Sequence, residues 1–406
     1  MSGENKTLFL FTAGYPYGTR DEPFLETEIN YLSKKFSTVI IFPRIKKNEI
    51  RDTPSNVKVV DFYSNLKPKN KLGVLLRNPT FLLRVLFKSK LKVKYIIDFI
   101  KHYRVHLDIL ASGIFEGEKL VELFKKLNIK EDDVVYDYWF INSIISIDYW
   151  RSKKKHENTL ICRAHRYDLY PEEWKMSVVP FTFYRLNVVN RLVFISKHGL
   201  NYLNAQTNRE FNEKFQLSYL GVNSPEKKNP QELKELYRIV SCARVVDFKN
   251  VHLIPKVLSQ LNTPIEWVHF GDGPMMSELE KNILDLPKNI KVILKGHQSN
   301  REVLYYYENT DVDAFISLSD SEGLPVSMME AQSFGIPIIA KNVGGTNEIV
   351  NESTGLLLEN NAPIPEIAAD LSNFIEFNKI KREGILSFFN ENFNASQNYE
   401  LFIEQF

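Results

Sequence analysis

Short apolar runs alternate with helix-patterned segments over most of the chain, and this alternation limits the possible folds more than any other feature. Six such runs precede residue 200 and five follow residue 235. Strand, helix and strand in succession are typical of a parallel sheet covered by helices. A chain of 406 residues exceeds the size of one such core. The sequence therefore predicts two doubly wound, Rossmann-like α/β domains.

The boundary between these domains is expected near Gly221, where a polar, proline-containing segment at 224–232 interrupts the alternation. We predict an N-terminal domain at 1–222 and a C-terminal domain at 223–385. A last helical segment is expected at 386–406.

Charge divides the chain at the same place. Residues 1–223 carry 36 Lys and Arg against 24 Asp and Glu, a net charge of +12. The remainder carries 16 against 26, a net charge of −10. Such a split indicates two domains with different partners.

Composition excludes several classes of protein. Hydrophobic residues make up 44% of the chain and charged residues 25%, values that indicate a globular protein. No apolar run is long enough for a membrane span, and the N-terminal residues do not have the pattern of a signal peptide. Two cysteines, Cys162 and Cys242, exclude a disulfide framework and a cysteine-based zinc site. We expect a cytoplasmic protein.

The stretch from Asp320 to Val350 carries the densest set of chemical signals. An apolar strand at 313–319 leads into a turn, and a helix is predicted from about Pro325 to Phe334. Two carboxylates bracket this junction, Glu322 in the turn and Glu330 on the second helical turn. Backbone N–H groups and the positive end of the helix dipole favour a phosphate at such a junction.

These residues resemble a known family. The pattern Glu-x7-Glu, followed by G-x-P-I-I-A at 335–340 and G-G-x-x-E-I-V at 344–350, is similar to the donor site of retaining GT-B-fold glycosyltransferases of the large glycosyltransferase group 1 family. The resemblance implies the GT-B fold, with two Rossmann-like domains facing across a cleft and the C-terminal helix packed back on the N-terminal domain.

The resemblance also implies an activity. A sugar would move from a nucleotide diphospho-sugar, with UDP favoured over GDP, to a hydroxyl of a glycan or lipid-linked glycan. The N-terminal domain would bind the acceptor and the C-terminal domain the donor. The product would be a capsule, exopolysaccharide or other surface glycan, and transfer would need neither a metal nor another cofactor.

Several donor-site residues follow from the same resemblance. Arg244 and Lys249 match the Arg and Lys of G-R-L-x-x-x-K-G, which clamp the diphosphate, and Ala243 and Asn250 replace the two glycines without changing a charge. Glu330 would accept hydrogen bonds from the ribose. The remaining expected donor contacts are Gly14, Gly271, Gly296, His297, Gly323, Leu324, Pro325 and Val326.

The first domain is expected to supply the other catalytic group. The sequence R-A-H-R-Y-D at 163–168 resembles the family's R-x-H-x-x-D, which places His165 beside the donor sugar, where Glu322 would also lie. These two residues are the predicted catalytic pair. The predicted acceptor contacts are Tyr17, Glu22, Glu26, Arg166 and Asp168, and a purely structural role stays open for each.

The stretch from Lys67 to Arg104 has a different character. It contains eleven Lys and Arg, one acid (Asp98) and interleaved apolar residues. Such a segment can lie on an anionic lipid surface, so we expect peripheral association with the inner face of the cell membrane. The alternative is that its apolar residues cover the sheet while its lysines are solvated. No nucleic-acid-binding module accompanies the basic residues, so nucleic acid is not an expected partner.

The sequence disfavours three further interpretations. Asp311-Val-Asp313 resembles a metal-binding pattern of another glycosyltransferase fold, but it leads directly into a strand, so no metal site is predicted. A GT-B-fold nucleotide-sugar epimerase would have no reason to carry the Glu-x7-Glu pattern. A non-catalytic nucleotide- or glycan-binding protein would be expected to lack one of Arg244, Lys249, Glu322 or Glu330.

Overall fold

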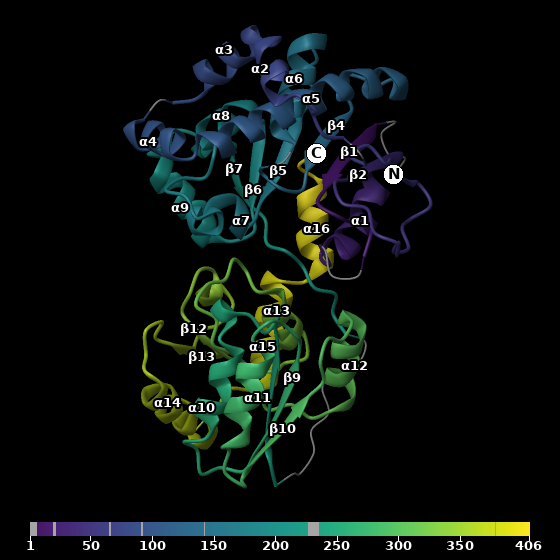
Figure 1. Cartoon of the computed structure of the whole chain (residues 1–406). Helices are drawn as coiled ribbons and strands as arrows, with labels where there is room; N and C mark the ends of the chain where they lie inside the picture. Colours follow the sequence, from purple (N-terminus) through teal and green to yellow (C-terminus); the bar gives the residue numbers. More distant parts are fainter. Residues whose placement is uncertain are drawn as a thin grey trace. The chain divides into compact units, whose positions relative to one another are not determined.

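The computed structural model describes residues 6–18, 22–64, 66–90, 92–141, 143–225, 235–377 and 379–406. The chain divides into two compact units (Figure 1). The first unit is Met1–Ser218 with Tyr399–Phe406, and the second is Tyr219–Asn398. The expected boundary at 222/223 thus falls inside the second unit. Most of the expected polar linker lies outside the described residues.

The first unit is built on a seven-stranded parallel sheet with the order β3-β2-β1-β4-β5-β6-β7. Its central strands are buried along their length, which explains why they read as continuous apolar runs. The half-buried β7 was not predicted, because three residues at a sheet edge give little pattern. The strands are β1 Thr7–Thr12, β2 Thr38–Pro43, β3 Val57–Val59, β4 Val134–Asp137, β5 Leu160–Ala164, β6 Arg191–Phe194 and β7 Phe215–Leu217.

Helices cover this sheet, and two of them approach each other closely. A Cβ on Gly113 or Gly117 would lie 2.6 Å from the side chain of Ile145 or Tyr149, so glycine is needed where α5 meets α6. The helices are α1 Leu25–Lys35, α2 Lys71–Leu76, α3 Pro79–Lys88, α4 Val93–Lys101, α5 Tyr103–Leu127, α6 Ile144–Lys154, α7 Arg166–Leu169, α8 Thr182–Val188 and α9 Lys197–Thr207, with 3-10 turns at Pro171–Trp174 and Asn212–Lys214.

The second unit contains a six-stranded parallel sheet with the order β10-β9-β8-β11-β12-β13. Its strands are β8 Tyr237–Cys242, β9 Ile265–Phe270, β10 Ile290–Leu294, β11 Ala314–Ser317, β12 Ile338–Lys341 and β13 Gly355–Leu358. Its helices are α10 Ile254–Leu258, α11 Met276–Leu284, α12 Asn300–Asn309, α13 Val326–Ser333, α14 Ile364–Phe377, α15 Arg382–Asn392 and the start of α16 Ala395–Ile403, with 3-10 turns at Asp247–Lys249, Val251–Leu253 and Thr346–Glu348. The prediction of two Rossmann-like domains is confirmed.

Helix α13 begins one residue later than predicted. Pro325 has φ −74° and ψ 107°, an extended conformation, so it caps the helix and is not its first residue. Its carbonyl accepts a hydrogen bond from the N–H of Met328 at 3.1 Å. The helix ends at Ser333, and Gly335 follows with φ +72°, a conformation that glycine adopts without strain.

The C-terminal residues belong to both units. Of the segment expected at 386–406 to pack on the first domain, residues 386–398 lie in the second unit and 399–406 in the first. There the ring of Phe402 lies 5.7 Å from that of Tyr136 on β4, and Phe406 lies 5.4 Å from the same ring. Helix α16 therefore supplies core residues to a sheet whose strands end nearly 200 residues earlier.

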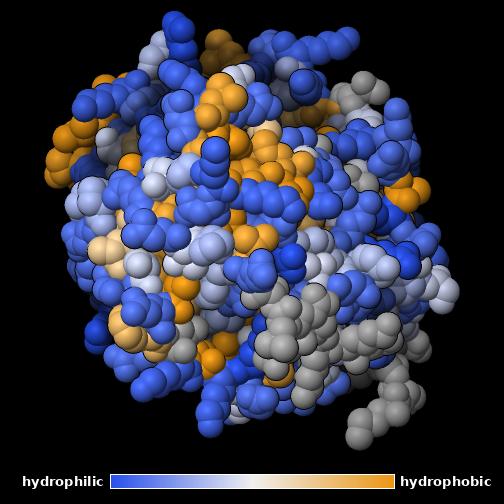
Figure 2. All heavy atoms as spheres, turned by 90° about the horizontal axis from the view of Figure 1, so that it is seen from below, coloured by the Kyte–Doolittle hydropathy of each residue, from blue (hydrophilic) through white to orange (hydrophobic). Residues whose placement is uncertain are grey.

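Exposed apolar side chains concentrate in one segment of the first unit. Thirteen of the 21 large hydrophobic side chains that are exposed among the described residues lie between Leu72 and Leu107. Figure 2 shows another face of the molecule, which is largely hydrophilic with hydrophobic residues gathered near its middle. Within the described residues, no helix has the length and apolarity needed to cross a bilayer.

Candidate active site

The loops that follow the strands of the second unit carry the predicted donor-site residues. The strand order reverses between β8 and β11, and ligands of such sheets bind outside the carboxyl ends of the strands at this point. Arg244 and Lys249 follow β8, and Glu322 follows β11. The fold therefore brings the predicted diphosphate clamp and the predicted sugar-binding carboxylate to the same edge of the sheet.

Lys249 and Glu322 form an ion pair at this edge. Nζ of Lys249 lies 2.6 Å from Oε1 of Glu322, whose side chain is buried. Arg244 lies nearby in sequence but is exposed, and its side chain has no partner among the residues that the structure describes. One cation of the predicted clamp is thus held against a carboxylate and the other faces solvent.

Backbone hydrogen bonds brace the loops against one another. The N–H of Asp320 donates to the carbonyl of Phe248 at 2.8 Å, and the N–H of Gly345 donates to the carbonyl of Gly323 at 3.0 Å. Gly344 has φ +55°, and a Cβ there would meet the carbonyl oxygen of Glu322 at 1.8 Å. Gly344, the first glycine of the G-G-x-x-E motif, is therefore needed for close packing against the Glu322 loop.

The loops after β9 and β10 are joined in the same way. The N–H of Gly271 donates to the carbonyl of Gly296 at 2.8 Å. Gly271 has φ +147°, and a Cβ there would lie 1.9 Å from the carbonyl oxygen of Ala243. His297 is exposed beside them, whereas Leu324 and Pro325 are buried and Val326 begins α13. The predicted donor residues of this unit thus form one continuous set of braced loops.

Glu330 lies on α13 and is half-buried. The side-chain amide of Asn300 donates to its Oε1 at 2.6 Å. Burial raises the pKa of Glu330 to about 7, and the Asn300 hydrogen bond offsets only part of this shift. Glu330 therefore changes its charge near neutral pH.

This titration predicts pH-dependent nucleotide binding. If the ionised carboxylate accepts the ribose hydroxyls, the affinity for the nucleotide should rise about tenfold from pH 6 to pH 8, following the ionised fraction. The phosphate of a nucleoside diphosphate titrates in the same range. Calorimetric titration of Glu330→Gln therefore serves as the control: this variant should lose the carboxylate's part of the pH dependence. An unchanged pH profile in Glu330→Gln would contradict the assignment.

In the first unit, Glu22 organises the loop that follows β1. Its carboxylate accepts hydrogen bonds from the backbone N–H groups of Ala13, Gly14 and Tyr15, at 2.8 to 2.9 Å. The indole N–H of Trp139 donates to the same carboxylate at 2.5 Å. Glu22 is buried and held by four donors, so it positions this loop, and the predicted acceptor contact stays a prediction.

His165 is buried among aromatic rings after β5. Its ring centroid lies 4.5 Å from that of Trp139, 4.9 Å from that of Tyr138 and 6.0 Å from that of Phe24. Neither ring nitrogen has a hydrogen-bond partner in the described part of the chain. The predicted catalytic histidine is therefore held by stacking, and its Nδ1 lies 3.6 Å from Oδ2 of Asp168.

The other predicted acceptor residues are placed differently. Asp168 is buried; its Oδ2 accepts the backbone N–H of His165 at 2.8 Å, and its Oδ1 has no partner among the described residues. Arg166 pairs with Glu173, and Glu26 pairs with Arg51 at 3.3 Å. Tyr17 is half-buried, and its N–H donates to the carbonyl of Gly14 at 2.7 Å. Asp168 thus contacts the histidine directly, whereas Arg166 and Glu26 lie in ion pairs.

Arg163 of the same motif has a structural role. It is fully buried, lies 3.2 Å from Glu28 on α1, donates to the hydroxyl of Tyr136 at 2.9 Å, and covers the ring of Phe402 at 4.2 Å. The Tyr136 hydroxyl in turn donates to Glu28 at 2.8 Å. This network joins α1, the sheet and α16.

No metal site is visible in the described residues, which contain no group of three or more His, Cys, Asp or Glu suited to a metal ion. Asp313 accepts the backbone N–H of Arg238 at 2.6 Å, and Asp311 pairs with Arg382 at 2.8 Å. Both aspartates of the Asp-x-Asp pattern thus interact with an arginine residue beside the start of β11.

Comparison with known proteins agrees with this geometry. Residues 223–385 match the family Glycosyl transferases group 1. The chain therefore carries a glycosyl transferases group 1 domain, and its two Rossmann-like domains have the GT-B fold, as predicted.

Particular relatives can be named. The chain is 28% identical over 151 residues to the amylovoran biosynthesis glycosyltransferase AmsK of Erwinia amylovora, covering 35% of this chain and 37% of that protein. It is 33% identical over 125 residues to the O-antigen biosynthesis glycosyltransferase WbnH of Escherichia coli, covering 30% and 34%. The chain thus spans about a third of the length of these curated relatives.

Solved structures match over nearly the whole chain. The apo form of the lipopolysaccharide outer core galactosyltransferase WaaB covers 98% of both chains with a TM-score of 0.69 at 18% identity. Anabaena HepE in complex with UDP covers 98% of this chain and 99% of its own with a TM-score of 0.65 at 15% identity. At these identities the likeness shows the fold alone.

Proposed function

We propose that this protein is a retaining, metal-independent glycosyltransferase of surface-glycan synthesis. It would move a sugar from a nucleotide diphospho-sugar, UDP being favoured over GDP, to a hydroxyl of a glycan or lipid-linked glycan. The observation that carries the proposal is the Lys249–Glu322 pair beside the unpartnered Arg244, at the switch point of a group 1 domain.

Each group of that edge has a chemical task. The leaving diphosphate gains negative charge as the glycosidic bond breaks, and Arg244, Lys249 and the N-terminus of α13 offer positive charge without a metal. Lys249 is already oriented by Glu322 at 2.6 Å. When a diphosphate shares this cation, the Glu322 carboxylate becomes available to the sugar.

The reaction itself follows a front-face course. The bond between the anomeric carbon and the diphosphate oxygen breaks, and the acceptor oxygen bonds to the same face of the sugar. The acceptor proton passes to the departing phosphate oxygen. We assign Glu322 and His165 to the positive charge that develops at the anomeric carbon. Nε2 of His165 has no hydrogen-bond partner among the described residues and suits a hydrogen bond to the sugar.

The names of relatives support the substrate class. One Escherichia coli relative, 35% identical over 97 residues, is named as a UDP-Gal:alpha-D-GlcNAc-diphosphoundecaprenol alpha-1,3-galactosyltransferase. Others are named for amylovoran, O-antigen and capsular polysaccharide synthesis. None of the relatives named here is an epimerase, which leaves a non-catalytic binding protein as the competing function.

A thermal-shift experiment tests the donor site. UDP, GDP and ADP are added with and without Mg²⁺ to the wild type, to Arg244→Ala and to Lys281→Ala, which removes an exposed cation of α11 in the same unit. One nucleotide at 100 times its Kd should stabilise the wild type and Lys281→Ala by about 2.7 kcal/mol.

Arg244→Ala should lose most of that shift, because it removes a cation from the diphosphate. A shift that requires Mg²⁺ would contradict metal independence. Nucleotide binding without sugar transfer to any lipid-linked acceptor would favour the non-catalytic protein.

We also propose that the first unit associates peripherally with an anionic membrane through residues 67–104. Helices α3 and α4 leave large apolar side chains uncovered, among them Phe87 (88% exposed), Val93 and Ile100. The uncovered residues do not support the alternative that this segment only covers the sheet. Apolar side chains beside exposed lysines are typical of peripheral membrane binding.

Vesicle flotation tests this association. Binding to vesicles with 30% phosphatidylglycerol should be several-fold weaker in the double variant Phe87→Ser/Ile100→Ser than in the wild type, because less apolar surface enters the bilayer. The control is Leu284→Ser, which removes an exposed leucine from the second unit. Equal binding by all three proteins would contradict the proposal.

A further inference from the structure

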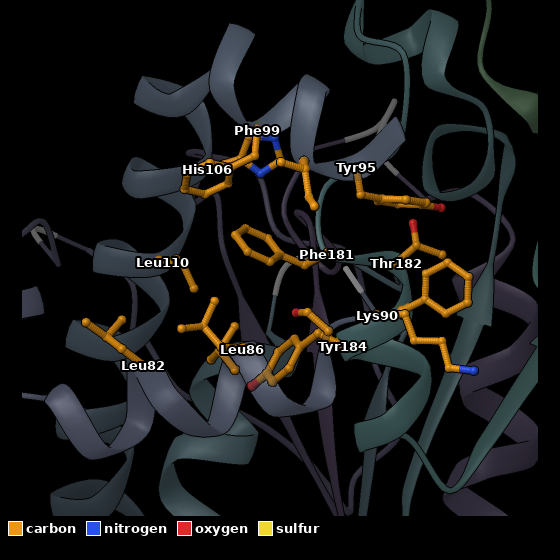
Figure 3. A pocket seen from close by; sticks show the side chains of 14 residues that line it. Leu82, Leu86, Lys90, Tyr95, Phe99, His106, Leu110, Phe181, Thr182 and Tyr184 are labelled. Atoms are coloured by element: carbon orange, nitrogen blue, oxygen red, sulfur yellow. The ribbon is translucent and has the colours of Figure 1, made fainter. Parts of the chain in front are cut away.

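The first unit contains an apolar cavity of about 320 Å³ between α3, α4, α5 and α8. Figure 3 shows side chains from these helices around one common space, with Leu82 and Leu86 of α3, Phe99 of α4 and Leu110 of α5 among them. Cavities of this size are large enough for a ligand, and an apolar lining disfavours water.

The cavity reaches the molecular surface. Two of its lining residues, Leu86 and Ile96, are 54% and 40% exposed. They adjoin the uncovered apolar residues of α3 and α4 in sequence. A ligand in the cavity would therefore continue into the surface that we assign to the membrane.

Helix α4 forms one wall; its aliphatic side chains are exposed, and Tyr95 is partly buried against the core. Its only buried residue is Asp98. Oδ1 of Asp98 accepts the N–H of Ser177 at 2.7 Å, and Oδ2 lies 3.2 Å from Nε2 of His106 on α5. A polar anchor thus holds α4 in place while its apolar residues face the cavity or the outside.

Several lysines lie on or next to α4, which forms one wall of the cavity. Lys90 lines the cavity and pairs with Glu210, and Lys92 donates to a backbone carbonyl at 3.5 Å and lies 4.6 Å from the ring centroid of Phe183. Lys94 and Lys101 have no acidic partner among the described residues. Lysines beside an apolar cavity match a ligand with a hydrocarbon chain and an anionic head.

We propose that this cavity binds one acyl chain of an anionic bilayer phospholipid. The proposal deepens the membrane association proposed above and rests on it. An apolar lining of this volume selects a hydrocarbon chain, the opening among exposed apolar residues places its source in the bilayer, and the unpaired lysines select an anionic head. The bound chain would fix the first unit to one lipid, in addition to the general adsorption of its surface.

Binding of a fluorescent fatty acid, 11-(dansylamino)undecanoic acid, tests the cavity directly. The wild type should bind one chain per protein. Leu110→Trp and Ile96→Trp, which fill the cavity from α5 and from its rim, should each weaken binding at least tenfold. Leu284→Ser removes an exposed leucine of the second unit and should bind the probe like the wild type. Thermal unfolding of each variant reports whether it is folded.

The outcomes separate the two proposals. One outcome is that the wild type floats with vesicles and yet shows no saturable binding of one fatty acid. That result would overturn the proposal that the cavity binds an acyl chain and would leave the membrane association standing. If folded Leu110→Trp and Ile96→Trp bound the probe as well as the wild type, the proposal that the cavity binds an acyl chain would also be overturned. A competition experiment identifies the class of chain. If farnesyl phosphate displaced the probe far better than dodecyl phosphate, the bound chain would be an isoprenoid and not an acyl chain. Dodecyl phosphate as the equal or stronger competitor supports the proposal.

Discussion

Glu322→Gln is expected to lower the rate of sugar transfer by about 10²–10³-fold, because an oriented carboxylate no longer faces the charge that develops at the anomeric carbon. The glutamine keeps the shape of the side chain and the hydrogen bond to Lys249, so the braced loops should persist. Nucleotide binding, measured by calorimetry, should change little. The loss should therefore appear in kcat.

The matched control is Glu352→Gln, which neutralises a carboxylate that is exposed in the same unit. It should retain wild-type turnover. If Glu322→Gln turned over at the wild-type rate with the same lipid-linked acceptor, the assignment of Glu322 would be wrong. If Glu322→Gln instead lost nucleotide binding with little change in kcat, the pair with Lys249 would serve the diphosphate alone.

Arg163→Leu is expected to destabilise the first unit by about 3–5 kcal/mol, because it leaves Glu28 buried without its counter-charge. Burial already raises the pKa of Glu28 despite Arg163 and the Tyr136 hydroxyl. A carboxylate with a raised native pKa binds more protons when folded than when unfolded, so the stability of the variant should fall as pH rises above the unfolded pKa. Urea unfolding at pH 5 and pH 8 measures both effects.

The double variant Arg163→Met/Glu28→Leu is the informative control, since replacing a whole buried pair with apolar residues is often neutral. It should recover much of the lost free energy of unfolding and its pH dependence. Equal destabilisation in the single and double variants would show that packing over Phe402, and not charge, sets the effect.

The second unit could be predicted closely because its signals are local. Glu322, Glu330 and the glycines of 344–345 lie between β11 and the loop after β12, and the packing of Gly344 against Glu322 joins the loops at the ends of these two neighbouring strands. Strand β13 was not predicted, because a strand of four residues gives little pattern in the sequence.

The first unit was harder to predict because its contacts depend on distant segments. The sequence shows a carboxylate at Glu22 but not that its backbone, with φ +49°, directs it toward the loop at 13–15. Trp139 belongs to an apolar run, yet β4 ends at Asp137, so its ring lies in the loop against His165. Apolar periodicity in α4 indicates a helix with one apolar face, but the sequence does not show that the fully buried residue of this helix is Asp98 while its aliphatic residues stay exposed.

Helix α16 has a consequence for how the protein is made. The core of the first unit includes Phe402, which lies against Arg163 and Tyr136. During synthesis the ribosome must deliver all of the second unit before these residues emerge. The first unit, though translated first, therefore cannot complete its core until the second has been translated, and the usual order of cotranslational folding does not hold for its final step.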